Sequence, residues 1–271
     1  MTLPISAFVI CHNEENYIEA CIRSLHMCAE IVVVDSGSTD QTLQILVRLS
    51  GEGFPIILLQ EPWRGYAGQK QFALEQCTKE WCLSIDSDER VSHFLATDML
   101  RLTTVADVTA WQVTRYPFLI GYGYVPPSAK ERFNTRLFRN GTAAFNLADK
   151  VHEGVRVHGR VEKAQNGGLL HFRPIGLREQ ILKENKYSSL KADMKVDQGE
   201  VARPWKMILG PILYFLRLYL RNNLWRCGWA GFIQAGTGAV YSFLTEAKRW
   251  ETQAVLRNPP VEPDVSKLDR Y

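Results

Sequence analysis

The segment from Glu30 to Asp35 constrains the fold of this chain more than any other. It reads Glu-Ile-Val-Val-Val-Asp, a continuous β-branched run, and the turn-forming cluster Ser36–Asp40 follows it directly. β-Branched residues favour strands, and a strand without polar alternation is expected where both faces of a parallel sheet are covered. The segment therefore predicts a central strand in an α/β fold.

Strand and helix signals alternate on both sides of this segment. Strands are expected at 5–10, 55–60 and 81–86, and helices, from the spacing of apolar residues, at 17–25, 42–49 and 69–78. Such alternation implies right-handed crossovers and a mostly parallel, Rossmann-type sheet flanked by helices. With 271 residues, of which 46% are hydrophobic, the chain can bury the core that this fold needs.

Polar clusters follow three of these strands. They are Asn13-Glu14, Asp35-Ser36-Gly37-Ser38 and Asp86-Ser87-Asp88. In open α/β sheets, ligands bind outside the carboxyl ends of the strands. We therefore expect the three clusters to form one polar rim with a binding function.

The acidic cluster has the most direct chemical meaning. Side chains two apart on an extended strand point the same way, so Asp86 and Asp88 are expected to converge on one cation. Oxygen ligands of this kind favour Mg²⁺ or Mn²⁺ over zinc. The alternative for an isolated Asp-x-Asp pair is a solvated turn whose aspartates cap the next helix.

Four motifs lie in order along the first part of the chain. They are Cys11-His12-Asn13-Glu14-Glu15, Val33-Val34-Asp35-Ser36-Gly37-Ser38-Thr39-Asp40, Gly65 with Gln69-Lys70, and Asp86-Ser87-Asp88-Glu89. Their order and spacing resemble the family 2 glycosyltransferases of the GT-A fold. Together with Arg136–Arg139 and Val151-His152-Glu153, they look like the lipopolysaccharide-core glucosyltransferases of the WaaE type. The resemblance covers about Ile5 to Phe172, and Ser87 stands where alanine is commoner.

This resemblance implies an inverting enzyme that takes a hexose from a nucleotide-diphosphate sugar such as UDP-glucose. It implies donor contacts from His12, Asn13, Glu14, Asp35, Gly37, Ser38, Gly65, Gln69, Lys70, Asp86 and Arg136. Asp88, together with Asp86, would hold Mg²⁺ or Mn²⁺. Glu153 would be the catalytic base beside His152, with Glu89 and Asp149 as alternatives.

Several of these residues also have simpler structural interpretations. Asp35 and Ser38 are typical of residues that cap the following helix, and Lys70 of a solvated helical side chain. His152 has the alternative of a satisfied structural histidine. Arg136 and Arg139 are three residues apart, so in a strand they face opposite sides and only one can reach the phosphates.

Local character divides the chain into three parts. Residues 1–173 are expected to form the GT-A domain, with a donor half at about 1–106 and an acceptor half at about 107–173. In the acceptor half, aromatic residues around Gly121–Pro127 suit a sugar ring, although such clusters are core packing at least as often. Residues 174–258 are expected to form a helical C-terminal extension, and the proline-rich residues 259–271 an extended tail.

The extension combines bases with apolar runs. From Val201 to Arg257 it holds eight bases and two acids, and Arg203, Lys206, Arg217 and Arg221 fall on one side of a helical projection. Pro211 and these charges leave an apolar run too short to span a bilayer. We expect a helix pair on an anionic membrane surface, with apolar contacts from Ile208, Leu213, Phe215, Leu218 and Trp225. The alternatives are a helical subdomain or a contact in a homo-oligomer.

Composition narrows the compartment and the partners. The six cysteines form no Cys-x-x-Cys pair and have no matching histidine spacing, so reduced core thiols are expected, with neither disulfides nor zinc. The short apolar run 5–11 has no basic region before it, so no signal peptide is expected. A net charge of +3 argues against a nucleic-acid partner. These features favour the cytoplasm, with peripheral binding to the cytoplasmic face of the inner membrane.

The leading hypothesis is a metal-dependent hexosyltransferase that acts on a lipid-linked saccharide such as the lipopolysaccharide inner core. A polyprenyl-phosphate sugar synthase would share the donor domain but use a phosphate acceptor. A nucleotidyltransferase would need a glycine- and arginine-rich loop near the N-terminus, which residues 12–15 do not supply. A non-catalytic sugar-nucleotide binding module is disfavoured because Asp86 and Asp88 are both intact.

Overall fold

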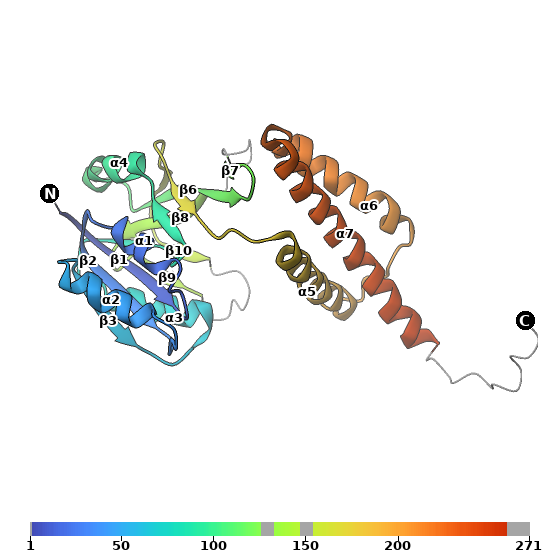
Figure 1. Ribbon diagram of the computed structural model, residues 1–271, viewed down its shortest axis with the longest axis horizontal. Coiled ribbons are helices and arrows are strands. Elements are labelled where there is room, and N and C mark those ends of the chain that lie inside the picture. The colour runs from blue at the N-terminus through green and yellow to red at the C-terminus, as the bar shows by residue number, and fades with distance from the viewer. Residues whose placement is uncertain (1, 126–132, 147–153, 259–271) are drawn as a thin grey trace, which may run out of the picture. The chain divides into compact units, whose positions relative to one another are not determined.

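The computed structural model describes residues 2–125, 133–146 and 154–258. The chain divides into two compact units. The first comprises Met1–Phe118 with Tyr124–Arg173, and the second comprises Leu119–Gly123 with Pro174–Tyr271. The first is an α/β unit and the second is helical, as the labels in Figure 1 show.

The first unit is built on the predicted central strand. This strand, β2 (Cys28–Asp35), lies between β1 (Leu3–Cys11) and β3 (Ile56–Gln60). β4 (Trp81–Ser84) lies on the other side of β1, and all four strands are parallel. The expected parallel arrangement of the first four strands is therefore confirmed.

Beyond β4 the sheet becomes mixed. β8 (Phe133–Arg139) is antiparallel to β4, and β6 (Ala110–Leu119) is antiparallel to β8. β12 (Leu169–His171) runs parallel to β6 and antiparallel to β5 (Glu89–Val91). The short strands β7 (Gly123–Tyr124) and β11 (Val161–Lys163) also pair with β6, while β9 (Ala143–Phe145) and β10 (Val155–Val157) form a separate sheet. The pairing of β12 with β5 brings Phe172 next to Asp88. The backbone N–H of Phe172 donates to the backbone carbonyl of Asp88 at 2.9 Å.

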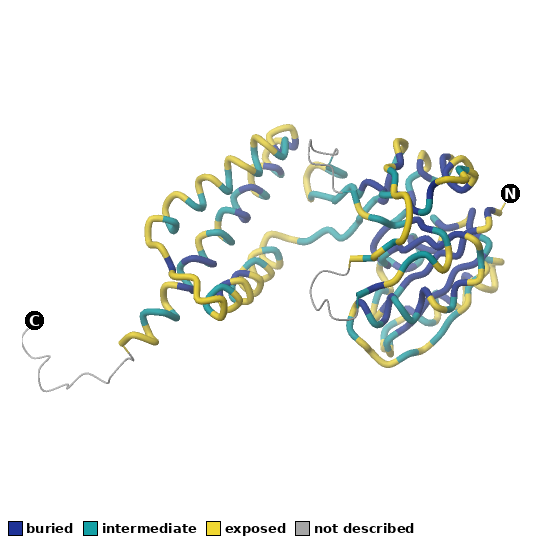
Figure 2. The backbone as a smooth tube through the Cα atoms, turned by 180° about the vertical axis from the view of Figure 1, so that it is seen from behind, coloured by how far each residue is buried: buried dark blue, intermediate teal, exposed yellow. Residues whose placement is uncertain are grey.

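Helices cover both faces of the parallel half. They are α1 (Ile18–Arg23), α2 (Thr42–Gly51), α3 (Gly65–Glu75) and α4 (His93–Thr104). Ile31 and Val33 of β2 belong to the core shared with α1, α2 and α4, whereas Val32 and Val34 belong to the core shared with α3. Figure 2 shows these central strands as the buried part of the unit. The absence of polar alternation in β2 thus reflects burial on both faces, as predicted.

The described part of the second unit contains three long helices. These are α5 (Leu177–Asp197), α6 (Trp205–Leu216) and α7 (Gly228–Arg257), with the helical turns η1 (Arg217–Arg221) and η2 (Leu224–Cys227) between α6 and α7. α7 packs against both α5 and α6. Pro211 lies inside α6. None of the described helices has the length and apolar character that crossing a membrane requires.

Two of the bases in this unit connect α7 to other segments, Arg249 to the loop before α6 and Lys248 to α5. Arg249 is 1% exposed, and its guanidinium pairs with Glu246 at 2.7 Å and donates to the carbonyl of Val201 at 3.0 Å. Lys248 donates from Nζ to the carbonyl of Asn185 on α5 at 2.7 Å. The positive charge that faces solvent is therefore smaller than the count of bases between Val201 and Arg257 suggests.

Candidate active site

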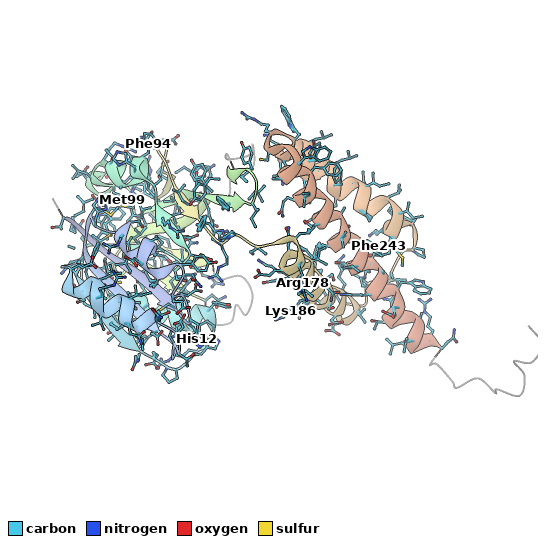
Figure 3. The ribbon with its side chains drawn as sticks, viewed as in Figure 1. His12, Phe94, Met99, Arg178, Lys186 and Phe243 are labelled. Carbon is cyan, nitrogen blue, oxygen red and sulfur yellow. The ribbon has the colours of Figure 1, made fainter. Side chains whose placement is uncertain are left out.

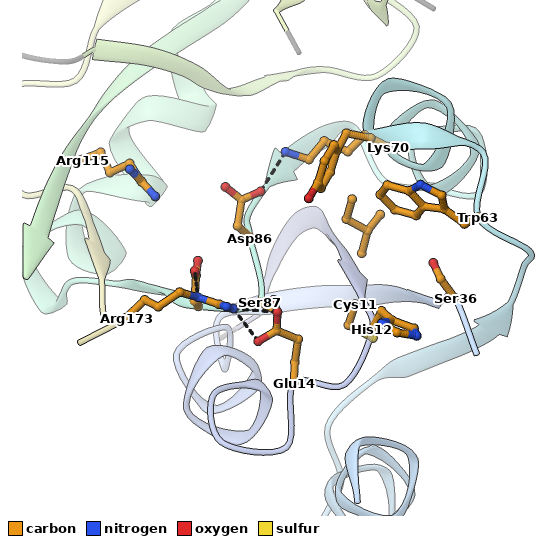
Figure 4. Close-up of a pocket in the computed structure, with 13 residues that line it drawn as sticks. Cys11, His12, Glu14, Ser36, Trp63, Lys70, Asp86, Ser87, Arg115 and Arg173 are labelled. Atoms are coloured by element: carbon orange, nitrogen blue, oxygen red, sulfur yellow. Dashed lines mark hydrogen bonds and ion pairs between the residues drawn. The ribbon is translucent and has the colours of Figure 1, made fainter. Parts of the chain in front are cut away.

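One pocket lies at the carboxyl ends of β1, β2 and β4. Its volume is about 760 Å³. Its described lining consists of Ile10, Cys11, His12, Glu14, Ser36, Trp63, Tyr66, Lys70, Asp86, Ser87, Asp88, Arg115 and Arg173. Figure 4 shows how most of these side chains surround the space. The expected polar rim is therefore present, and it includes the predicted residues His12, Glu14, Lys70, Asp86 and Asp88.

Asn13 ties the loop after β1 to the loop after β2. Its backbone has a positive φ of 55°, which asparagine tolerates better than most residues. Its side-chain oxygen accepts the N–H of Thr39 at 2.8 Å, and its own N–H donates to Ser38 Oγ at 2.9 Å. Asn13 and Ser38 therefore shape the rim, and neither is among the residues that line the pocket.

Asp35 organises the loop that follows β2. It is fully buried, and its carboxylate accepts the N–H groups of Gly37 and Ser38, both at 2.9 Å. Gly37 has φ of 91°, in the left-handed region that glycine enters without strain. Neither Asp35 nor Ser38 caps α2, because the N–H of Thr42 donates to Asp40 instead, at 3.0 Å. The simple capping interpretation of Asp35 and Ser38 is therefore wrong.

Gly65 and Gln69 shape the loop after β3. Gly65 has φ of 77° at the first residue of α3, where a side chain would be strained. Gln69 is fully buried and donates to Ser36 Oγ at 3.1 Å. These contacts hold the segment that carries Trp63 and Tyr66, whose rings meet edge to face with centroids 4.8 Å apart. Both rings line the pocket, although the sequence motifs did not point to them.

Asp86 lies between two cations. Lys70 Nζ is 2.8 Å from its Oδ1, and Arg136 Nη2 is 3.0 Å from its Oδ2. Burial would raise the pKa of Asp86, but the charges of Arg136 and Lys70 hold that pKa well below its usual value. Lys70 is buried, so its interpretation as a solvated helical side chain is wrong. It orients a carboxylate, as does Arg136, whereas Arg139 pairs with Glu80.

Asp88 is held by two residues that the sequence motifs did not indicate. Arg173 donates from Nε to Asp88 Oδ2 at 2.7 Å, and His171 Nε2 lies 3.1 Å from the same oxygen. Arg173 also donates from Nη2 to both oxygens of Glu14, at 2.6 and 2.7 Å, and lies over the ring of Tyr17. Burial would raise the pKa of Asp88, but its hydrogen bond with His171 and the nearby charges lower it. Asp88 and Asp86 are therefore both ionised at neutral pH.

The two aspartates do not belong to one extended strand. β4 ends at Ser84, and the N–H of Glu89 donates to the carbonyl of Asp86 at 2.9 Å, so residues 86–89 form a turn. Strand alternation, which predicted that Asp86 and Asp88 point the same way, therefore does not apply. Both still reach one pocket because the turn lies at its edge, yet they contact different cations.

The structure describes the two predicted metal ligands but not the predicted catalytic base. Within residues 2–125, 133–146 and 154–258, no three His, Cys, Asp or Glu side chains form a cluster that could enclose a metal ion. Three carboxylates, those of Glu14, Asp86 and Asp88, line the pocket within these residues. His152, Glu153 and Asp149 lie outside the described residues. Glu89 is described and fully buried, with Arg115 at 2.7 Å and Arg136 at 3.0 Å.

The aromatic cluster expected to bind an acceptor packs partly on itself. Phe118 contacts Tyr124 with ring centroids 5.4 Å apart and Phe172 with centroids 4.8 Å apart. Such pairs are typical of core packing. Most of the Gly121–Pro127 loop is described, but residues 126 and 127 are not.

The sheet and the pocket at its strand ends are those of a glycosyltransferase with the GT-A fold. Residues 6–149 match the profile of glycosyl transferase family 2, and the chain belongs to this family. A curated relative, the lipopolysaccharide core biosynthesis glycosyltransferase LpsC of Rhizobium meliloti (strain 1021), is 54% identical over 97% of this chain and 98% of its own length. An uncharacterized glycosyltransferase of Rickettsia prowazekii (strain Madrid E) is 29% identical over 90% of this chain and 86% of its own length.

Solved structures show the same fold at low sequence identity. The structure of residues 1–349 of S. aureus TarS in complex with UDP-GlcNAc is 17% identical, with a TM-score of 0.52, and the match covers 97% of this chain and 93% of that one. The same protein in complex with UDP matches with a TM-score of 0.50 and 18% identity over the same shares of the two chains.

Proposed function

We propose that this protein transfers a hexose from a nucleotide-diphosphate sugar, UDP-glucose, to a lipid-linked saccharide of the lipopolysaccharide core, with inversion at the anomeric carbon. The observation that carries the proposal is the pocket, where ionised carboxylates and basic side chains meet at the ends of parallel strands. The nearly full-length match to LpsC, whose name refers to lipopolysaccharide core biosynthesis, supports the choice of acceptor. The proposal places the reaction at the cytoplasmic face of the inner membrane.

Within the part of the site that the structure describes, acidic and basic side chains lie in close pairs. Four carboxylates pair with four basic side chains: Asp86 with Lys70 and Arg136, Glu89 with Arg115 and Arg136, and Asp88 and Glu14 with Arg173. A donor diphosphate would add negative charge to these pairs. Because unpaired charge is costly in a partly buried site, this supports a role for a further cation.

The residues of the site suit Mg²⁺ or Mn²⁺ in that role. Mg²⁺ is commonly held by one or two carboxylates together with substrate phosphates, and carboxylate oxygens suit Mn²⁺ equally. Asp88 would be the first ligand and Asp86 the second carboxylate at the site, with the imidazole of His171 beside Asp88. A divalent cation bound there stabilises the negative charge of the leaving nucleoside diphosphate.

The remaining contacts position the donor. Trp63 and Tyr66 are each about half exposed and present flat apolar surface to the pocket, which suits a nucleobase. Arg115 and Arg173 line the same space and can turn toward phosphate oxygens when a donor competes with their carboxylate partners. His12 and Ser36 offer polar groups for the ribose.

Inversion in one displacement requires a base for the acceptor hydroxyl, on the face opposite the leaving group. We assign this role to Glu153, with His152 orienting it or contacting the pyrophosphate. Glu89 is a poor alternative because its carboxylate is fully buried and already accepts from Arg115 and Arg136. Asp149 remains the second candidate.

The test is a transfer assay with the purified protein, UDP-[¹⁴C]glucose, Mn²⁺ and lipopolysaccharide from a strain that lacks the protein. We expect the lipopolysaccharide to gain one hexose by mass spectrometry. The variant Asp88→Asn should transfer at least roughly 100-fold more slowly, since it removes charge stabilisation of the leaving group. It should also bind Mn²⁺ more weakly by calorimetry.

The matched control is Asp98→Asn. Asp98 is also a largely buried aspartate held by an arginine, Arg101 at 2.8 Å, but it lies on α4 and does not line the pocket. Its activity and Mn²⁺ binding should equal those of the wild type. Normal transfer by Asp88→Asn in the presence of a chelator would exclude the metal role. Transfer of the hexose to polyprenyl phosphate, with none to lipopolysaccharide, would exclude the proposed saccharide acceptor.

A further inference from the structure

An exposed apolar stripe runs along α6 and continues into η1. Its members recur three or four residues apart and are each between 43% and 69% exposed: Trp205, Ile208, Leu209, Ile212, Leu213, Leu216 and Leu220. None of the residues of α6 is buried. Residues at this spacing share one side of a helix, so the stripe is continuous.

The opposite side of α6 and η1 packs on α7. Tyr214 contacts Tyr241 with ring centroids 6.2 Å apart, and Leu218 and Tyr214 both lie against Gly238, where a β-carbon would meet Leu218 at 2.4 Å. Leu218, predicted to contact a membrane, packs against Gly238 of α7, and Phe215 from the same prediction lies beside Phe232 at the edge of the packed side. Trp225 and Leu213, from the same prediction, are exposed.

A second apolar stripe runs along α7. Its exposed members are Trp229, Phe232, Ile233, Val240, Phe243 and Trp250, and Figure 3 marks Phe243 among them. The other sides of α7 are occupied within the unit. Thr237 Oγ1 accepts from Gln180 of α5 at 2.8 Å, and Gly231 lies so close to Leu224 that a β-carbon would meet its carbonyl oxygen at 1.9 Å.

The two stripes meet at an aromatic contact. The ring of Phe232 on α7 lies 5.3 Å from that of Phe215 and 5.9 Å from that of Tyr219, measured between centroids. Trp229 lies 5.7 Å from Phe232. We call the two stripes and this contact the apolar face. Soluble proteins rarely expose so much contiguous apolar surface without a partner.

Charge identifies the kind of partner. The segment from Trp205 to Thr245 holds four bases, Lys206, Arg217, Arg221 and Arg226, and no acid. Arg217, Arg221 and Arg226 are exposed. A second copy of the chain docked through this face would bring bases against bases. An anionic lipid surface offers both apolar depth and negative charge.

We propose that the apolar face lies flat on an anionic bilayer, with its aromatic and aliphatic side chains at the level of the headgroups and its bases near lipid phosphates. This inference rests on the proposed function, since a lipid-linked saccharide is presented at a bilayer. The helical unit then holds the catalytic unit near its acceptor. Burial of the apolar side chains gives binding that salt does not remove, and the bases add attraction that fades within a Debye length.

The test uses the full-length protein and vesicles of phosphatidylcholine with or without phosphatidylglycerol, separated by flotation without donor or acceptor. We expect binding to the anionic vesicles and partial release at high salt. The double variant Ile212→Glu/Leu216→Glu should bind at least tenfold more weakly to both kinds of vesicle. Arg217→Gln/Arg221→Gln should lose about 30-fold on anionic vesicles only, from about five-fold per base.

The matched control places the same acids on another exposed apolar surface. Phe94 and Leu100 of α4 are 72% and 51% exposed, so Phe94→Glu/Leu100→Glu should bind vesicles like the wild type. Circular dichroism confirms that each variant is folded. The proposal would be overturned if Phe94→Glu/Leu100→Glu lost as much vesicle binding as Ile212→Glu/Leu216→Glu. It would also be overturned if the wild type bound neutral and anionic vesicles equally.

Light scattering in the absence of lipid tests the alternative that a second copy of the chain covers the apolar face. A dimer that Ile212→Glu/Leu216→Glu converts to monomers, with no vesicle binding by the wild type, would make the apolar face an interface between copies and overturn the proposal. Transfer to the saccharide in detergent is measured separately. If the wild-type protein transfers the hexose but does not bind vesicles, only this inference is contradicted. If the wild-type protein binds vesicles but does not transfer the hexose, only the proposed function is contradicted.

Discussion

Asp86 and Asp88 are two residues apart but have different partners. Asp86 pairs with Lys70 and Arg136, whereas Asp88 contacts His171 and Arg173. Each carboxylate keeps a low pKa because cations offset its burial. The site is therefore ionised and preorganised around neutral pH. Under the proposed function, donor binding would change the partners of these charges and not their protonation.

The proposed catalytic base, Glu153, gives a prediction for a single residue. Glu153→Gln keeps the shape of the side chain but removes its basicity, so we expect kcat to fall by roughly 10² to 10⁴, the usual range for an acid–base group. Donor affinity, measured by calorimetry with the nucleotide-diphosphate sugar, should stay unchanged. A variant with the full wild-type rate would move the role to Asp149, and Asp149→Asn would then carry the loss.

At the scale of elements, one buried carboxylate joins three segments at the end of the sheet away from the pocket. Glu30 of β2 is 5% exposed, and its Oε1 accepts the hydroxyl of Ser6 on β1 at 2.6 Å and the N–H of Thr78 at 2.9 Å. Thr78 lies between α3 and β4. Burial would raise the pKa of Glu30, but the hydrogen bonds from Ser6 and Thr78 lower it.

We expect Glu30→Gln to lower the free energy of unfolding by about 1–3 kcal/mol at pH 7, the range for hydrogen bonds to a charged group. Because the folded pKa is below the unfolded value near 4.3, the stabilisation is present above that pH and is lost as pH falls through the folded pKa. Urea unfolding should therefore show the gap between wild type and variant closing as pH falls below the unfolded pKa near 4.3. Glu19→Gln, which removes an exposed partner of Arg48, should change stability less at pH 7. A gap that is independent of pH would contradict this account.

Glycines of α7 give a second test at this scale. A β-carbon at Gly231 would lie 1.9 Å from the carbonyl oxygen of Leu224, whereas one at Gly236 would meet nothing within 4 Å. Gly231→Ala should loosen the packing of η2 on α7 and raise hydrogen exchange of both segments. Gly236→Ala should stabilise α7 by roughly 0.5–1 kcal/mol, the helix preference of alanine over glycine. Equal exchange in the two variants would show that the close approach does not matter.

At the scale of the molecule, the two units differ in how much they bury. The first has continuous cores on both faces of its sheet. In the second, the buried residues of α5 are Ser188 and Ala192, and α6 has none. The longest helix, α7, buries seven residues, of which Gly231, Ala235 and Gly238 are small. The small interior of this unit is consistent with the proposal that a bilayer covers its apolar face.

The cysteines give a prediction for the whole chain. All six are buried and unpaired, and burial raises the pKa of Cys28 to about 12. Because the thiolate is the reactive form, Ellman's reagent should react slowly with the native protein. In urea, where the thiols are exposed, it should react with all six. Mass spectrometry after brief alkylation identifies any exception. One thiol that reacts quickly in the native state would show that its segment opens readily.

Local sequence determined the parallel half of the sheet and the position of the rim. A strand covered on both faces must be apolar throughout, as β2 is, and polar residues directly after parallel strands must meet at one edge. Both properties are encoded in short segments, so Glu14, Asp86 and Asp88 could be predicted to lie together, whereas His12 and Lys70 were expected at the site only from the family resemblance. The family could be recognised for the same reason, because its motifs occupy these strand ends.

Only the tertiary structure decided which charges meet. His171 contacts Asp88 across 83 residues and Arg173 contacts Glu14 across 159, because β12 pairs with β5 and β6 in the mixed half of the sheet. No local period encodes that pairing, so the two residues could not be found from the motifs. The contact of the buried Arg249 with the carbonyl of Val201, 48 residues away, was likewise decided by the packing of the helices. Short segments specify how a strand or helix is buried, whereas strand order and helix packing specify which side chains it meets.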